Sequence, residues 1–129
     1  MPISELTNRT DALKARTKDF AIRVFHLVEA LPKSLQGRAV ANQIIRSGTS
    51  VAANYRAAGR ARSRAEFIAK IGMVEEEADE TLFWLELIVE THLLRVTKLK
   101  PLLREADEIV SIMAASRKSA IANRQSAIR

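Results

Sequence analysis

Basic side chains are concentrated in one stretch of the sequence, between Glu29 and Glu66, where no acidic residue occurs. Arginine presents a planar fork of N–H donors that matches phosphate oxygens, and it stays charged at any cellular pH. The stretch therefore predicts phosphate binding. Its seven basic residues, six of them arginine, are Lys33, Arg38, Arg46, Arg56, Arg60, Arg62 and Arg64.

Four of these arginines fall on one side of a predicted helix over residues 34–59. At about 100° per residue they lie within an arc of roughly 80°, opposite an apolar stripe, and Asn42 and Thr49 fall in the same arc. The stripe consists of Val40, Ile44, Gly48, Val51 and Tyr55. We expect nucleic-acid contacts from this face and from the turn that follows it, at Arg38, Arg46, Arg56, Arg60, Arg62 and Arg64.

Two other interpretations of the arginines stay open. Charged helix faces are often simply solvated. The arginines could also pair with carboxylates of the next helix, within the subunit or across a subunit contact, and exposed pairs of that kind add only about 0–1 kcal/mol each. The segment from Glu66 to Glu90 contains only one basic residue, Lys70. The candidate partners are its acids, Glu66, Glu75, Glu76, Glu77, Asp79, Glu80, Glu86 and Glu90.

The same acidic segment has more apolar side chains than one core stripe needs. Met73, Phe83, Trp84 and Leu87 project away from the face centred on Phe67 and Leu85. A second patch with Trp and Phe, bordered by charge, is typical of a protein contact. These four residues predict an oligomer interface, and the alternative is that Trp84 or Met73 contacts a neighbouring helix of its own subunit.

No catalytic, metal or cofactor site can be recognised in the sequence. The two histidines, His26 and His92, lack the paired Glu-x-x-His motifs of di-metal bundles, and no zinc spacing is present. Glycines occur singly, so the sequence contains neither a Walker phosphate-binding loop nor the glycine motif of dinucleotide-binding proteins. There is no cysteine. We therefore expect a protein that is not an enzyme and binds no cofactor or metal.

The elements that would position these residues are four amphipathic helices with short connections. Apolar spacing predicts a first helix that ends at Leu31 and a second helix over residues 34–59. A third helix starts at the capping box Ser63-Arg-Ala-Glu66, and a fourth has Pro101 in its first turn. The interval 92–100 is the expected last connection. Short links let consecutive helices pack side by side, so the predicted fold is all-α, an antiparallel up-and-down four-helix bundle.

Length and composition fit one domain. The chain has 129 residues, a net charge of +6 and a pI of about 10.2. We expect the bundle over residues 1–118 and a disordered basic tail over 119–129, because the apolar pattern weakens after Arg117. No secretory signal or membrane span can be recognised, which predicts a cytoplasmic protein that is not bound to a membrane.

The segment from Gln43 to Phe67, with Arg46, Ser50, Asn54 and Ser63, resembles the four-helix-bundle proteins encoded by intervening sequences in bacterial 23S ribosomal RNA genes. The resemblance continues through Glu77-Ala-Asp-Glu-Thr-Leu-Phe-Trp84. It implies an up-and-down subunit that assembles as a homopentamer, with no established enzymatic activity. Similar members often carry glutamate directly after Asn-Tyr-Arg, where this sequence has Ala57, which leaves the segment more basic.

The leading hypothesis is a non-catalytic oligomer that binds nucleic acid, RNA more than DNA, through the arginine face. Repeating a weak cationic face in each subunit would give avidity. Phosphate contacts carry little base information, so no sequence specificity is expected. The alternative is a homo-oligomeric scaffold or protein-docking module with no nucleic-acid ligand.

Overall fold

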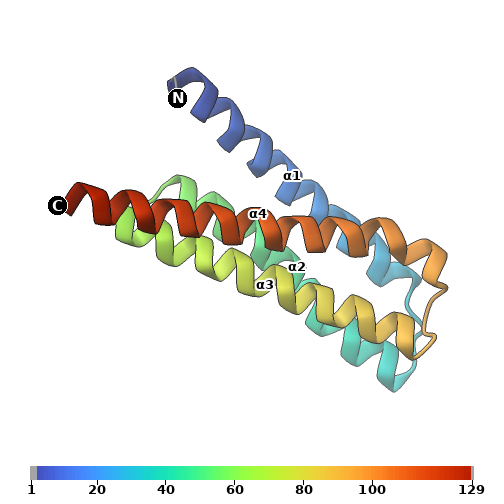
Figure 1. Ribbon diagram of the computed structural model, residues 1–129. Coiled ribbons are helices and arrows are strands. Elements are labelled where there is room, and N and C mark those ends of the chain that lie inside the picture. Colours follow the sequence, from blue (N-terminus) through green and yellow to red (C-terminus); the bar gives the residue numbers. More distant parts are fainter. Residues whose placement is uncertain (1–2, 129) are drawn as a thin grey trace.

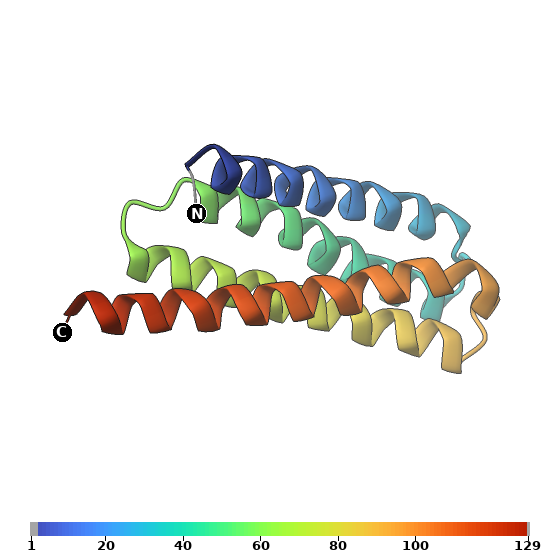
Figure 2. The ribbon, with the colours of Figure 1, turned by 45° about the horizontal axis from the view of Figure 1, so that its top comes forward.

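The protein is an antiparallel up-and-down bundle of four helices, as the sequence predicts (Figure 1). The structure, a computed structural model, describes residues 3–128, and its side chains are described for residues 8–123. The helices are α1 (Ile3–Ala30), α2 (Leu35–Gly59), α3 (Arg64–Glu90) and α4 (Val96–Ile128). The connections α1–α2 and α3–α4 lie at one end of the bundle, and α2–α3 lies at the other (Figure 2).

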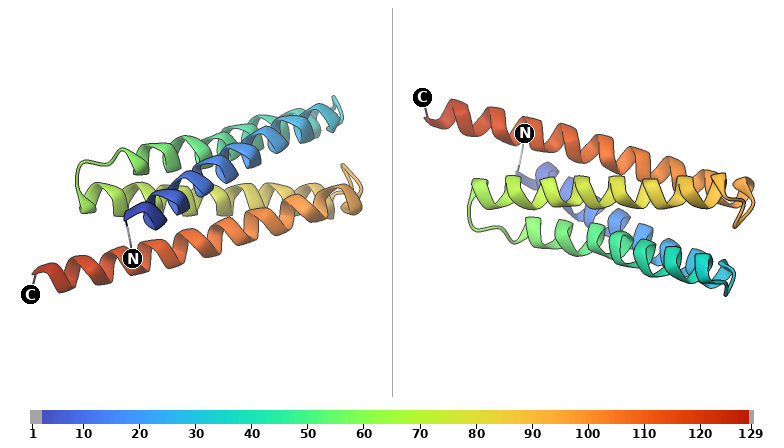
Figure 3. Two further views of the ribbon diagram at one scale, coloured as in Figure 1. Left: turned by 90° about the horizontal axis from the view of Figure 1, so that it is seen from above. Right: turned by 90° about the horizontal axis from the view of Figure 1, so that it is seen from below.

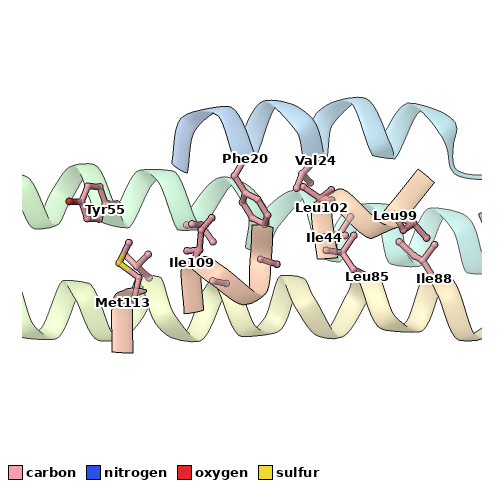
Figure 4. Close-up of a cluster of buried hydrophobic side chains, with 14 of the residues drawn as sticks. Phe20, Val24, Ile44, Tyr55, Leu85, Ile88, Leu99, Leu102, Ile109 and Met113 are labelled. Carbon is pink, nitrogen blue, oxygen red and sulfur yellow. The ribbon is translucent and has the colours of Figure 1, made fainter. Parts of the chain in front are cut away.

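The core is made by the apolar stripes of all four helices. Phe20, Ile44, Leu85 and Ile109, one from each helix, are fully buried and are spread along the bundle axis (Figure 4). Burying a side chain of this size contributes about 1.5–3 kcal/mol. Between α2 and α3, the buried Thr81 hydroxyl donates a 2.8 Å hydrogen bond to Ser47.

Helix α1 is packed unevenly. It lies mainly on α2 and meets α4 over a much shorter stretch, and its N-terminal part rises away from the other helices (Figure 1). The close approach to α2 occurs at Gly48, where an added Cβ would lie 2.9 Å from Val24 Cγ2. The side chain of Arg16 connects α1 to α4 through Glu105, with Arg16 Nε 2.8 Å from Glu105 Oε2.

The last helix differs from the sequence prediction at both ends. It begins at Val96 inside the interval expected to be a connection, and Pro101 lies in its second turn, not its first. At the other end α4 continues as helix through residues 119–128, where the sequence predicted a disordered tail. Alanine, arginine and glutamine favour helix, and no glycine or proline interrupts this segment. The C-terminal end extends beyond the α2–α3 connection (Figure 3).

Candidate nucleic-acid interface

The arginine cluster at the α2–α3 connection is the most concentrated positive charge among the predicted contacts. Arg56, Arg60 and Arg62 line an open hollow of about 410 Å³, together with Ala57 and one acid, Glu66. All three arginines are exposed. None of the ion pairs formed within the described part of the chain involves them. We name these three residues the corner cluster.

Local helix capping holds the corner cluster in place. Helix α2 ends at Gly59, where the Arg60 N–H donates to the carbonyl of Ala57 and the Ala61 N–H donates to the carbonyl of Ala58. Helix α3 then starts at the N-cap Ser63, whose Oγ accepts a 3.0 Å hydrogen bond from Glu66 N. The Glu66 carboxylate accepts from the Arg62 backbone N–H at 3.2 Å, one residue before the cap position that the motif predicted. Capping thus fixes the backbone that carries the cluster.

Arg46, predicted as part of the same face, is paired inside the subunit. Its guanidinium bonds to Glu77, with Nη1 3.2 Å from Oε2, and to Glu80, which also accepts from Trp84 Nε1 at 3.1 Å. Burial opposes ionisation of Glu80, but the bonds from Trp84 and Arg46 outweigh it and lower the pKa of that carboxyl. The bond to Glu80 raises the pKa of Arg46. Arg46 therefore pairs with carboxylates of the next helix within the subunit, which was one of the two alternative interpretations of the arginines.

The remaining predicted arginines lie elsewhere. Arg38 is exposed at the opposite end of α2, close in sequence to the exposed Lys33 of the α1–α2 connection. We name Lys33 and Arg38 the distal pair. Arg64 instead lines a groove between α1 and α4, together with Arg9. The structure thus brings together only three of the six predicted nucleic-acid contacts.

The groove between α1 and α4 is a feature that the sequence did not reveal. It has a volume of about 1120 Å³ and includes Leu13, Phe67 and Ile112 in its lining. Tyr55 lies at its base, where burial raises the pKa of the phenol and a hydrogen bond with Thr10 opposes that effect. The groove exists because α1 rises from α4, and helix periodicity contains no signal for such a displacement.

The predicted oligomer interface is partly exposed in the single chain. Met73 and Phe83 are 43% and 53% exposed, whereas Trp84 and Leu87 are half-buried. The Phe83 ring meets Trp84 edge-on, with ring centroids 4.9 Å apart. A second exposed apolar pair, Ile22 and Phe25 of α1, was not predicted from the sequence. The available signal was their position outside the core stripe of α1.

Other types of site find little support in the described residues. No three His, Cys, Asp or Glu side chains among them are grouped so that they could hold a metal ion. His26 lines a separate hollow with Arg23 and Lys98, far from the corner cluster in the fold. None of the described helices is both long and apolar enough to span a bilayer.

Comparison with known proteins identifies similar chains. The model of a family described as 23S rRNA-intervening sequence protein matches residues 12–115. A crystal structure of a Bacteroides thetaiotaomicron protein, described as of unknown function and from the S23 ribosomal protein family, has a similar fold with a TM-score of 0.76. The two sequences are 34% identical, and the match covers 81% of this chain and 97% of that chain. No curated protein matches the sequence.

Proposed function

Because the chain belongs to the 23S rRNA-intervening sequence protein family, we propose that it is a non-catalytic, oligomeric nucleic-acid-binding protein. The corner cluster is the site that would hold the phosphates. The family description names 23S rRNA, and we propose RNA before DNA as the ligand to test.

One observation carries this proposal: Arg56, Arg60 and Arg62 line an open hollow and form no ion pair with the described carboxylates. Exposed guanidinium groups that lack a carboxylate partner keep their donors available for phosphate oxygens. Glu66 also lines the hollow, and its carboxylate accepts the backbone N–H of Arg62 and forms no ion pair with these three arginines. Ala57, in the hollow, adds no negative charge.

Assembly would strengthen the binding of each subunit. A subunit with three phosphate-binding arginines binds weakly at physiological salt, but several copies that engage one polymer gain avidity. The exposed Met73 and Phe83 of α3 are the surface that we propose for this contact.

The test is charge reversal in the corner cluster. The double variant Arg56→Glu with Arg60→Glu should lower affinity for a labelled structured RNA by more than about tenfold at low salt, because attractive phosphate contacts become repulsive. Fluorescence anisotropy at two salt concentrations measures the affinity, and circular dichroism checks that helicity is unchanged.

The matched control is Lys100→Glu with Arg104→Glu. These two residues are also exposed, four apart and on a helix, but lie on α4 outside the corner cluster. The control should retain most of the affinity. An equal loss in both double variants would show that net charge alone drives binding, and would contradict the assigned site.

A scaffold without a nucleic-acid ligand is the second candidate, and the pairing of Arg46 with Glu77 and Glu80 favours it. If neighbouring carboxylates also engaged the corner cluster in the assembled protein, its arginines would serve assembly. Measuring the mass in solution beside the anisotropy separates the two functions. An oligomer that binds neither RNA nor DNA at low salt would be a scaffold.

A further inference from the structure

Arg56 and Arg60 of the corner cluster and Arg38 of the distal pair lie on the same face of α2, near its two ends, while Arg62 and Lys33 belong to the adjoining connections. Eighteen residues separate Arg38 from Arg56, which is five turns of helix, so the two side chains leave α2 in the same direction. At 1.5 Å per residue their Cα atoms are about 27 Å apart, and Arg60 lies about 33 Å from Arg38. Both ends of the face are exposed.

The surface between these two ends carries no acid from α2, which contains no acidic residue. Asn42 and Thr49 occupy this direction on the helix, and the Thr49 hydroxyl donates to its own backbone at Ile45 O, 2.7 Å away. Arg46 is held toward α3 by Glu77 and Glu80. The middle of the face therefore has the uncharged Asn42 and Thr49 beside Arg46 and its two carboxylates, and each end of the face is positively charged.

We propose that the ligand of this face is a double helix lying along α2, with phosphates bound at both ends. The inference rests on the proposed function and specifies its ligand. A spacing of about 27–33 Å corresponds to about 8–10 base pairs at 3.4 Å per pair. One turn of duplex DNA spans about 34–36 Å, so phosphates on one side of a duplex recur at nearly this interval.

A single strand fits this face poorly. Proteins that bind single strands usually stack the bases on aromatic side chains. The only aromatic residue of α2 is Tyr55, which is buried, and the exposed Phe25 and Phe83 belong to α1 and α3. A duplex offers two rigidly spaced phosphate groups and needs no stacking.

The experiment compares hairpins that share one loop and differ in stem length, about six and about twelve base pairs, as RNA and as DNA. For each hairpin we measure the salt slope, that is, how steeply the logarithm of the affinity falls with the logarithm of the salt concentration. A longer stem offers the protein more positions to bind, which raises the affinity but leaves the salt slope unchanged. The slope should be steeper by about 0.9 for each phosphate contact that the long stem adds.

Variants of the distal pair identify the added contacts. Arg38→Ala and Lys33→Ala should each reduce the slope by about 1 on the long stem and leave the short stem unchanged. Arg104→Ala, an exposed arginine of α4, is the matched control and should change neither slope. An unpaired strand of the same length should show no dependence on Arg38.

The results separate the two proposals. If the short stem, the long stem and the single strand give equal slopes, or if Arg38→Ala acts equally on all three, the duplex assignment is overturned while the corner cluster stands as a phosphate site. If no RNA or DNA binds at low salt, both proposals fail.

Discussion

At the scale of single residues, neighbouring helices decide what each arginine of α2 can do. Arg46 and Arg56 are the same residue type on the same side of one helix, yet only Arg46 lies within reach of Glu77 and Glu80. The helical angles predicted from sequence place both residues correctly. The pairing depends on how α3 lies beside α2, which the angles do not contain.

Glu105 offers a test of a charged contact at this scale. The hydrogen bond from Arg16 lowers the pKa of the Glu105 carboxyl, against the effect of burial. A lowered folded-state pKa stabilises the protein fully above the ordinary carboxyl range, and this stabilisation is lost as pH falls through the folded-state pKa. Glu105→Gln should therefore cost about 1 kcal/mol at neutral pH and progressively less at acidic pH, below the ordinary carboxyl range.

Urea unfolding of the native protein and of Glu105→Gln at neutral and acidic pH measures this difference. Asp107→Asn is the control, since Asp107 is exposed on the same helix and forms none of the ion pairs in the described residues. A cost for Glu105→Gln that does not change with pH would contradict the role of the Arg16 contact.

At the scale of elements, the sequence predicted most of the fold because apolar spacing and capping are local. The buried stripe of α2 and the N-cap at Ser63 agree with the structure, and of the expected α3 face Leu85 is buried whereas Phe67 is only partly buried. The α3–α4 connection was predicted less well from the sequence. His92 N–H donates to Val89 O and Leu93 N–H to Ile88 O, which closes a Schellman turn with His92 at φ 57°. Glycine usually occupies that position, yet the expected connection over 92–100 did begin at His92, and the error was at its other end, where α4 begins at Val96.

The candidate site was only partly predictable for a related reason. The cationic face follows from sequence periodicity, whereas the groove that receives Arg64 follows from the rise of α1 away from α4. The exposure of Ile22 and Phe25 likewise depends on which helices pack against α1. These features depend on how the helices pack against one another, which the apolar pattern of a single helix does not reveal.

The contact between α1 and α2 can be tested at Gly48. Gly48→Ala should destabilise the protein by about 1–3 kcal/mol, because the added Cβ meets the buried, stiff side chain of Val24. In the double variant with Val24→Ala the two costs should not add, and the coupling should reach at least about 0.5 kcal/mol. Denaturant unfolding measures all three variants.

Gly59→Ala provides the matched control, since a Cβ at Gly59 would have no neighbour within 4 Å. That variant should be neutral or stabilised by up to about 0.5 kcal/mol. Simple additivity of Gly48→Ala and Val24→Ala would refute the close contact.

At the scale of the whole molecule, the exposed apolar residues of α3 predict self-association. Met73→Gln with Phe83→Gln should lower the mass in solution to that of one subunit, because the variant removes the apolar surface that association would bury. Light scattering measures the mass, and circular dichroism verifies that the subunit remains folded.

The comparison variant is Ile22→Gln with Phe25→Gln, which removes an exposed apolar pair of similar exposure from α1. We expect it to leave the mass unchanged. If the α1 variant dissociates and the α3 variant does not, the interface lies on α1 and the assignment to α3 is wrong.

The uneven packing of α1 also bears on how the chain folds. Nearly all of the packing joins helices that are consecutive in the chain, and the one pairing that links the two ends, α1 with α4, is the smallest. Contacts between consecutive helices close short loops at low entropic cost, which is typical of fast folding. The bundle can form one hairpin at a time, and the long-range closure of α1 on α4 has the least influence on the rate.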